Sequence, residues 1–257
     1  MSKVAIVTGS GGGGCGHAIA RRFARDGMSV VVSDVDEPGA RDTVRLIQSE
    51  RGHAAFLRAD VGAEQEVSEL FAFAERTFGG VDILVNNASA PYHPESPFAG
   101  WQETIQVDLL GAMYATLCAL RAFARRGGGA IVSMASISAL GHGKDHSPVP
   151  AYDVAKAGLI RLTTGLGMLA GQGVRVNCLA PGWIASPDVK AYVDSLAPAE
   201  RRERGVPDVL ITPDEIADAV LRLATDETLA GRVMVWWNGQ PPFLIPLGDP
   251  GHAGREP

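Results

Sequence analysis

The sequence predicts one α/β domain, 1–257, built on a doubly wound parallel sheet of seven strands flanked by helices. Apolar runs rich in Val, Ile and Ala are nearly continuous, as in parallel strands covered on both faces. Stretches of helical periodicity separate these runs, and this alternation is typical of a doubly wound sheet. The predicted strands are 3–8, 29–33, 54–59, 83–85, 130–134, 174–179 and 232–236.

The segments between the strands place apolar side chains three and four residues apart, as helices that pack on a sheet do. Ile19 and Phe23 form one such pair, and Val67, Leu70 and Phe71 form another set. Helical crossovers of this kind join parallel strands, so each strand is expected to be followed by a helix on one face of the sheet.

Two segments that follow strands, 137–150 and 182–212, lack a clear period. In an open α/β sheet, ligands bind outside the carboxyl ends of the strands, so these segments are expected to wall a substrate site, with the substrate loop at about 183–212. The tail 240–257 is rich in Pro and Gly and is expected to be loosely ordered after residue 248.

Composition excludes several classes of protein. The 257 residues include 23 Lys+Arg and 29 Asp+Glu, and the net charge of −6 excludes a nucleic-acid binder held by bulk charge. We find no apolar stretch of the roughly 18 residues that span a bilayer and no signal peptide, so no membrane partner is expected. The widely spaced cysteines, Cys15, Cys118 and Cys178, form no CxxC pair, which favours a reducing compartment, the cytoplasm.

The glycine-rich segment TGSGGGGCGHA, 8–18, follows the first predicted strand and opens the first helix. Glycines allow a tight turn and a close approach to a pyrophosphate, whose charge then lies on the free N–H groups of the helix. This position predicts a dinucleotide site of the Rossmann type. The residues expected to contact the cofactor in this turn are Gly9, Gly13, Gly14, Cys15 and Gly16.

Asp34 ends the second predicted strand, 18 residues after Gly16. A carboxylate at this point accepts hydrogen bonds from the adenosine ribose hydroxyls. The next residues, Val35 and 36–37, include no Arg or Lys to hold a 2′-phosphate, so the site is expected to bind NAD(H) rather than NADP(H). The alternative is a flexible loop with a capping aspartate.

Further motifs occur in a fixed order along the chain. They are ADV at 59–61, NNAS at 86–89, IVSMAS at 131–136, YDVAK at 152–156, RVNCLAPG at 175–182 and WNG at 237–239. With the glycine turn, they make the chain from Val4 to about Gly239 resemble the short-chain dehydrogenase/reductase family in its compact branch. The resemblance implies that Asp60 and Val61 contact the adenine and that Asn87 and Ala88 line the cofactor cleft. It also implies that the nicotinamide is held by Pro181, Gly182 and Ile184.

By the same resemblance, Tyr152 is the proton donor and acceptor, and Ser136 binds and orients the substrate oxygen. Lys156 lies four residues after Tyr152 on the same helical face, where its charge stabilises the phenolate, and it also binds the nicotinamide ribose. The hydride passes between the substrate carbon and the nicotinamide. These residues imply an NAD(H)-dependent oxidoreductase that acts on a small secondary alcohol or a carbonyl compound.

Three features depart from the family pattern. The glycine turn is one residue longer, and Ser136 and Tyr152 lie 16 residues apart, a longer spacing than usual, so Ser138 is an alternative to Ser136. Asp108 replaces an Asn that helps to position a water leading protons to the lysine through its main-chain carbonyl. Asp108 is therefore also expected to act in catalysis, and its carboxylate would raise the pKa of Lys156.

Three further features of the sequence each have two possible interpretations. Cys15 at a helix N-terminus is a redox switch or, as we favour, a small packed residue. His142 and His146 contact substrate or belong to a solvated loop, and no metal site is expected. Arg201, Arg202 and Arg204 grip an anionic substrate or form a solvated helix face, which we favour.

Two other functions compete with the dehydrogenase. One is a β-ketoacyl carrier-protein reductase, which more often uses NADPH, and the other is a dinucleotide-binding regulator without turnover. The predicted helices at 108–120 and 151–168 are apolar on more than one face, which suggests subunit contacts, and the resemblance implies a homotetramer. The substrate itself is not encoded in any motif.

Overall fold

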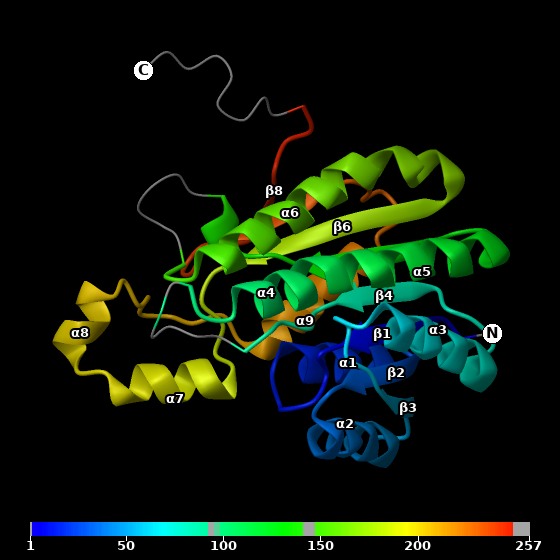
Figure 1. Ribbon diagram of the computed structural model, residues 1–257, viewed down its shortest axis with the longest axis horizontal. Coiled ribbons are helices and arrows are strands. Elements are labelled where there is room, and N and C mark those ends of the chain that lie inside the picture. The colour runs from blue at the N-terminus through cyan, green and yellow to red at the C-terminus, as the bar shows by residue number, and fades with distance from the viewer. Residues whose placement is uncertain (1, 92–95, 97, 141–146, 249–257) are drawn as a thin grey trace.

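The computed structural model describes residues 2–91, 96, 98–140 and 147–248, and it confirms the α/β fold with a doubly wound sheet (Figure 1). The strand order is β3-β2-β1-β4-β5-β6-β7-β8. The strands are β1 (Val4–Thr8), β2 (Ser29–Asp34), β3 (His53–Arg58), β4 (Ile83–Asn86), β5 (Gly129–Met134), β6 (Val174–Pro181), β7 (Val233–Trp236) and β8 (Phe243–Leu244). The order reverses between β1 and β4, the point at which such sheets bind nucleotides.

The sheet differs from the prediction in its eighth strand. β8 pairs antiparallel with β7, whereas the first seven strands are parallel as predicted. The strand is only two residues long and lies in the segment interpreted as a tail. Its pairing with Met234 and Val235 is a tertiary contact that no local pattern announces.

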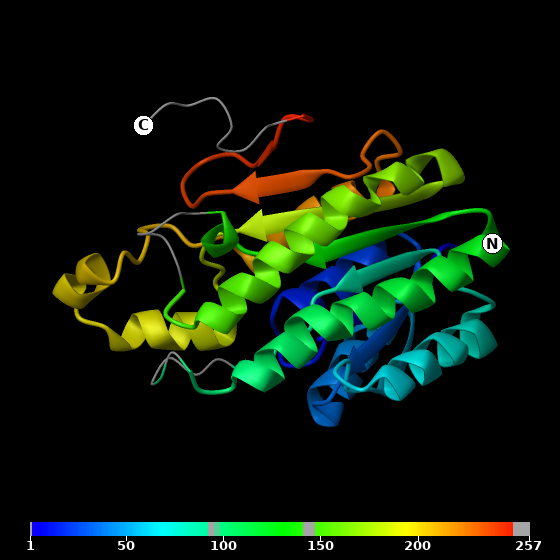
Figure 2. The same cartoon turned by 45° about the horizontal axis from the view of Figure 1, so that its top comes forward.

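Helices cover both faces of the sheet (Figure 2). The elements are α1 (Cys15–Arg25), α2 (Glu37–Ser49), α3 (Glu64–Phe78), α4 (Trp101–Thr104), the π-helix η1 (Ile105–Gly111), α5 (Ala112–Arg126), the 3-10 helix η2 (Ile137–Ala139), α6 (Pro150–Leu166), the 3-10 helix η3 (Gly167–Gln172), α7 (Pro187–Ser195), α8 (Pro198–Glu203) and α9 (Pro213–Thr225). α1, α2 and α9 lie on one face, and α3, α5 and α6 lie on the other.

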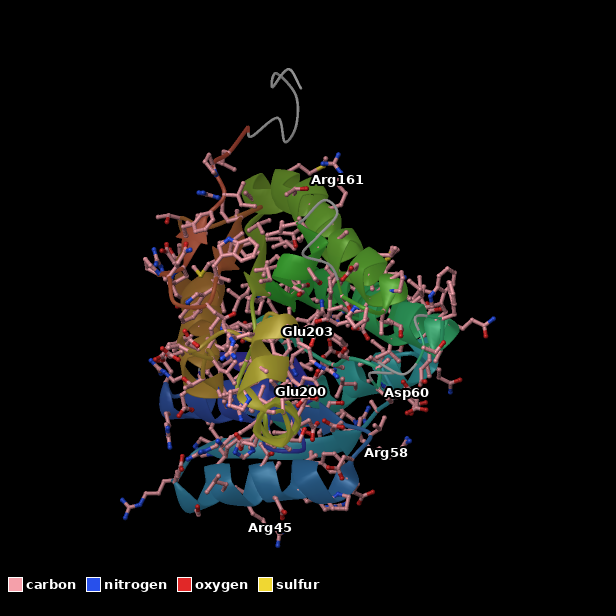
Figure 3. The ribbon with its side chains drawn as sticks, turned by 90° about the vertical axis from the view of Figure 1, so that its left-hand side faces the viewer. Arg45, Arg58, Asp60, Arg161, Glu200 and Glu203 are labelled. Carbon is pink, nitrogen blue, oxygen red and sulfur yellow. The ribbon has the colours of Figure 1, made fainter. Side chains whose placement is uncertain are left out.

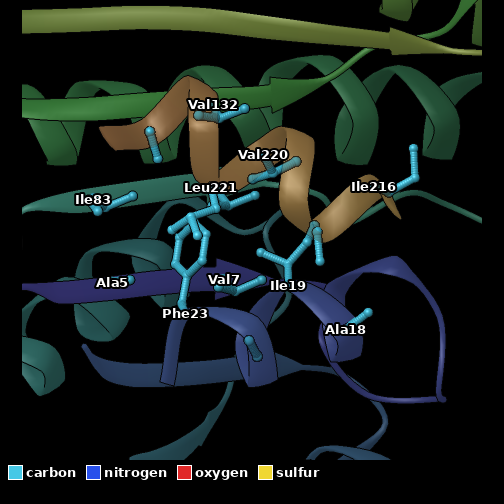
Figure 4. Close-up of a cluster of buried hydrophobic side chains, with 14 of the residues drawn as sticks. Ala5, Val7, Ala18, Ile19, Phe23, Ile83, Val132, Ile216, Val220 and Leu221 are labelled. Carbon is cyan, nitrogen blue, oxygen red and sulfur yellow. The ribbon is translucent and has the colours of Figure 1, made fainter. Parts of the chain in front are cut away.

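The two faces carry separate apolar layers. In one layer, Ile19 and Phe23 of α1 pack with Ile216 and Val220 of α9 against the central strands (Figure 4). These four side chains are fully buried. They repeat at helical spacing, so the predicted amphipathic periodicity places them all on the sheet.

One helical run is long and apolar enough to differ from the sequence prediction, which expected no stretch that could span a bilayer. By length and composition alone the run 101–126 could cross a membrane, although no such stretch was expected. Half of its most apolar window is buried inside the fold, where α5 packs on β4 and β5. Burial against the sheet accounts for its apolar character.

The segment 182–212 also holds more structure than its lack of periodicity suggested. It contains α7 and α8, which begin at Pro187 and Pro198. Proline has a fixed φ and no N–H, which suits the first helical position, so these prolines begin helices rather than interrupt them. Both helices project past the carboxyl ends of the strands, and Glu200 and Glu203 of α8 lie in front of that edge (Figure 3).

Candidate active site

The glycine turn brings the end of β1 directly against the start of α1. Gly9 has a φ of +63°, in the left-handed region that favours glycine. A Cβ added at Gly16 would lie 2.1 Å from the carbonyl oxygen of Gly9. Only a glycine at position 16 therefore allows the first turn of α1 to pack on the strand.

The N-terminus of α1 fits an anionic group. Gly14 is the N-cap of this helix and has no side chain to accept from its N–H groups. Among the described residues of α1, the first turn holds no acidic side chain. The first N–H groups of a helix have no partner within it. A Cβ added at Gly12 or Gly14 would meet nothing within 4 Å. Open space in front of free N–H groups is what a dinucleotide pyrophosphate requires.

Cys15 opens α1 as a packed residue. Its side chain is partly buried against the core of α1, α2 and α9. Burial raises the pKa of the Cys15 thiol to about 12, although a main-chain hydrogen bond opposes the rise. This direction favours the packing interpretation over a redox switch, because the thiolate is the reactive form.

Asp34 is held facing the glycine turn. The Gly11 N–H donates to its Oδ2 at 2.7 Å, and the Asp36 N–H donates to its Oδ1 at 2.9 Å. The carboxylate is half-buried, whereas Val35 beside it is exposed. The structure thus brings Asp34 to the turn as predicted. Sequence reasoning missed Gly11, whose only signal was its place in the glycine run.

Asn87 and Ala88 join β4 to β1 at the reversal of strand order. The Asn87 Nδ2 donates to the carbonyl oxygens of Thr8 and Gly9, at 3.0 and 2.8 Å. The Thr8 Oγ1 accepts from the N–H groups of Asn87 and Ala88. Thr8 is a positioning residue that the sequence reading did not single out.

Asp60 and Val61 follow β3 at the same edge of the sheet. The Asp60 Oδ1 accepts from the Gly62 N–H at 2.8 Å in a local turn. Val61 is buried, and a Cβ added at Gly111 would lie 2.8 Å from the Val61 carbonyl oxygen. Their contacts with adenine stay a prediction.

Asp108 and Lys156 form a buried ion pair. Asp108 lies on the π-helix η1 and is 2% exposed, and Lys156 on α6 is 3% exposed. The Asp108 Oδ2 lies 3.0 Å from the Lys156 Nζ. Burial by itself lowers the pKa of Lys156, but the charge of Asp108 and that of Tyr152 outweigh it and raise this pKa.

Tyr152 lies on the first turn of α6, beside Lys156. The Lys156 Nζ is 5.1 Å from the centre of the Tyr152 ring. The predicted proximity of the phenol and the ammonium is therefore present in the fold.

Ser136 lies two residues after the end of β5 and caps η2. Its Oγ accepts from the Ser138 N–H at 3.2 Å and from the Ser138 Oγ at 3.0 Å. Ser138 thus supports Ser136, and the two hydroxyls lie next to one another. His142 and His146, which follow in this loop, lie outside the described residues.

The segment after β6 is tied to the end of β7. The Gly182 N–H donates to the Trp236 carbonyl, and the Asn238 side chain exchanges two hydrogen bonds of 2.8 Å with the main chain of Trp183. A Cβ added at Gly182 would lie 2.1 Å from the Asn238 Oδ1. Asn238 belongs to the WNG motif, and its supporting contacts were not foreseen. Pro181 ends β6.

The substrate loop carries aromatic side chains close to this edge. Ile184 forms a β-bridge with Ile211 and anchors the loop. Trp183 and Tyr192 stack with ring centres 6.3 Å apart. Arg204 donates to the Tyr192 hydroxyl at 2.8 Å. The pairing of this arginine within the loop favours the solvated-face interpretation over a grip on an anionic substrate.

Within the part of the chain that the structure describes, no three His, Cys, Asp or Glu side chains gather as metal ligands. The site brings together a phenol, an ammonium and hydroxyl groups. The carboxyl edge of such a sheet binds nucleotides, and a phenol beside a buried ammonium moves protons. Fold and site together define the class of nucleotide-dependent oxidoreductases.

Comparisons with known proteins agree with that class. A family model described as Enoyl-(Acyl carrier protein) reductase matches residues 11–235. The cis-4-hydroxycyclohexanecarboxylate dehydrogenase of Sinomonas cyclohexanicum is 37% identical over 238 residues, which are 87% of this chain and 90% of that protein. The chain belongs to the short-chain dehydrogenase/reductase family.

Solved structures share the whole fold. A 7α-hydroxysteroid dehydrogenase complexed with NADH and 7-oxo glycochenodeoxycholic acid has a TM-score of 0.80 and 31% identity, covering 91% of this chain and 92% of that one. A variant actinorhodin polyketide ketoreductase with NADPH has a TM-score of 0.80 and 30% identity, covering 91% of this chain and 95% of that one. The protein is an oxidoreductase of the CH–OH class, and the two solved neighbours are complexes with NADH and NADPH, respectively.

Proposed function

We propose that this protein is an NAD(H)-dependent dehydrogenase that transfers a hydride between the nicotinamide and a secondary alcohol or ketone on a saturated ring. The observation that carries the proposal is the Tyr152 phenol beside the Lys156 ammonium, with its Nζ 5.1 Å from the ring centre, at the edge where the glycine turn meets Asp34. The nicotinamide supplies or accepts the hydride. The protein holds the substrate and moves the proton.

Three polar side chains share the work of this reaction. Tyr152 takes the proton of the alcohol during oxidation and returns it to the oxygen during reduction. Lys156 stabilises the phenolate and binds the nicotinamide ribose. Ser136, whose Oγ is fixed by two hydrogen bonds from Ser138, donates to the substrate oxygen.

The preference for NAD(H) rests on Asp34. Its two oxygens accept from main-chain N–H groups, which hold the carboxylate at the glycine turn, where it would accept hydrogen bonds from the adenosine ribose. A 2′-phosphate at that place would meet a fixed negative charge. The remaining cofactor contacts are proposed for Gly9, Gly13, Gly14, Cys15, Gly16, Val35, Asp60, Val61, Asn87, Ala88, Pro181, Gly182 and Ile184.

The substrate class is proposed from relatives and from the loop. Two of the dehydrogenases that resemble this chain are named for a hydroxycyclohexane carboxylate and a hydroxysteroid, which both carry a hydroxyl on a saturated ring. Trp183 and Tyr192 offer a stacked aromatic surface beyond the strand edge. An apolar ring buries its surface well against such side chains.

A second function is a β-ketoacyl carrier-protein reductase. The description of the matching family model and the polyketide ketoreductase with NADPH favour it. Asp34 opposes it, because that activity more often uses NADPH. A comparison of turnover with NADH on a cyclic ketone and with NADPH on a β-ketoacyl thioester separates the two functions.

Substitution of Tyr152 by Phe tests the mechanism. The change removes only the hydroxyl, so turnover is expected to fall by roughly 10²–10⁴-fold while NADH binding persists. Tyr114→Phe on α5, a tyrosine packed on the other apolar layer, is the matched control and keeps full turnover. Unchanged turnover in Tyr152→Phe contradicts the role of the phenol. Absence of turnover in the unmodified protein with every cyclic alcohol favours the regulator.

The assembly is proposed as a homotetramer in the cytoplasm. Met113 and Leu117 of α5 are each 43% exposed and Val154 of α6 is 58% exposed, so apolar side chains of both helices face outward. Exposed large apolar side chains are typical of subunit contacts. Analytical ultracentrifugation measures the assembly, and a monomeric mass at micromolar concentration contradicts it.

A further inference from the structure

The carboxylate of Asp108 is bound from two sides. Its Oδ2 accepts from the Ser89 hydroxyl at 2.6 Å and lies 3.0 Å from the Lys156 Nζ. Its Oδ1 accepts from the Ala90 N–H at 2.7 Å. The segment after β4, the π-helix η1 and α6 thus converge on one carboxylate, which fixes its orientation.

Because both charges are buried, each of them needs a partner of opposite charge and hydrogen bonds. Asp108 and Lys156 are almost fully buried, whereas Ser89 is exposed. A buried ammonium without a counter-ion loses its proton far more easily than one in water. A buried ion pair keeps both charges only when its other hydrogen bonds are made, as they are here.

Asp108 lies outside the reach of a substrate. The cavity beside it, lined by Thr8, Asn86, Ala88 and Leu159 among others, has a volume of about 10 Å³. That is about the space that one water needs. The carboxylate therefore acts through Lys156 and is a positioning residue.

We propose that Asp108 is the counter-ion that keeps Lys156 protonated and directed at Tyr152 in alkaline solution, and that Ser89 is the residue that holds Asp108 in this position. The effect of Asp108 on turnover rests on the proposed function. The ionisation of Lys156 does not depend on that function, and it is measured in a separate experiment.

The other titratable groups around Lys156 do not replace Asp108. The charges of Tyr152, on the same helix, and of Cys178, on β6, also act to raise the pKa of Lys156. Burial raises the pKa of the Cys178 thiol to about 12, so this thiol is neutral over the working range. Among the described groups that act on Lys156, Asp108 is the carboxylate.

Nuclear magnetic resonance of the protein labelled at the lysine side-chain nitrogen reads this ionisation directly. Lys3 and Lys190 are exposed and serve as internal references, and Lys156→Arg assigns the signal. We expect Lys156 to stay protonated at a pH where Lys3 is half titrated. In Asp108→Asn, burial is unopposed, so Lys156 is expected to lose its proton before Lys3. Titration of Lys156 before or together with Lys3 in the unmodified protein overturns the proposal.

The pH dependence of turnover gives the second measurement. Asp108→Asn is expected to lose roughly tenfold in kcat at pH 10 relative to pH 8, beyond any such loss in the unmodified enzyme. Asp82→Asn, which breaks the ion pair with Arg126 at the other end of the sheet, is the control for lost stability. A pH profile that moves equally in both variants overturns the proposal.

Ser89 is tested by a double-mutant cycle. Ser89→Ala changes an exposed residue, so it is expected to fold even where Asp108→Asn does not. We expect a fewfold loss of kcat in Ser89→Ala and no further loss when Ser89→Ala is added to Asp108→Asn. Additive losses overturn the role of Ser89. A protein inactive toward every alcohol, but with Lys156 protonated as expected, contradicts the proposed function and leaves this inference intact.

Discussion

Replacement of Asp34 by Asn is expected to remove most of the discrimination between NADH and NADPH. The carboxylate is half-buried and accepts from the N–H groups of Gly11 and Asp36. Asn keeps the shape and one acceptor oxygen but loses the charge. The exposed Asp36 N–H can turn to water, so the glycine turn is expected to stay folded.

The size of the effect follows from the charges. A 2′-phosphate carries about two negative charges, and each repels a carboxylate about 4 Å away by about 1 kcal/mol in a water-like medium. Loss of this repulsion is expected to lower the Kd for NADPH by roughly thirtyfold. NADH loses one charge-assisted hydrogen bond from its ribose, about 1 kcal/mol, so its Kd rises roughly fivefold. The ratio of the two Kd values therefore changes by roughly a hundredfold.

Titration of tryptophan fluorescence with NADH and then NADPH measures both Kd values. Asp36→Asn is the matched control, because it removes a neighbouring exposed carboxylate and is expected to leave the ratio nearly unchanged. Added salt is expected to weaken the discrimination of the unmodified protein by screening. A Kd ratio that stays within twofold in Asp34→Asn, with unchanged circular dichroism, refutes the reasoning.

Two further predictions concern the thiol of α1 and the core. Burial raises the pKa of Cys15 to about 12, so iodoacetamide at pH 8 is expected to alkylate it roughly a thousandfold more slowly than a free thiol. Mass spectrometry measures the labelling, and rapid labelling contradicts this prediction. Asn177 is fully buried and makes hydrogen bonds to two main-chain carbonyls and one N–H. Asn177→Ala is expected to cost about 2–4 kcal/mol and to lower Tm by roughly 5–15 °C in calorimetry, whereas an unchanged Tm would mean that water replaces these bonds.

The regular part of the fold was predictable because each signal is local. β2 is a run of buried valines, and both faces of such a strand are covered, so the run itself marks it. The glycine turn was predictable for the same reason, since Gly16 and the strand that precedes the turn are neighbours in sequence. Tyr152 and Lys156 are one helical turn apart, and the helix alone brings them together.

Tertiary structure decided the supports of the site. Gly11 and Asp34 are 23 residues apart, Ser89 and Asp108 are 19 apart, and Trp183 and Asn238 are 55 apart. No periodicity joins such pairs, because the order of the strands and the packing of the segments between them place the partners in contact. The sequence by itself predicted which residues carry the chemistry, and those roles stay a prediction. Only the folded chain decided that the carboxylate facing the lysine is buried and is held by an exposed serine, because burial and hydrogen-bond geometry exist only once distant segments pack together.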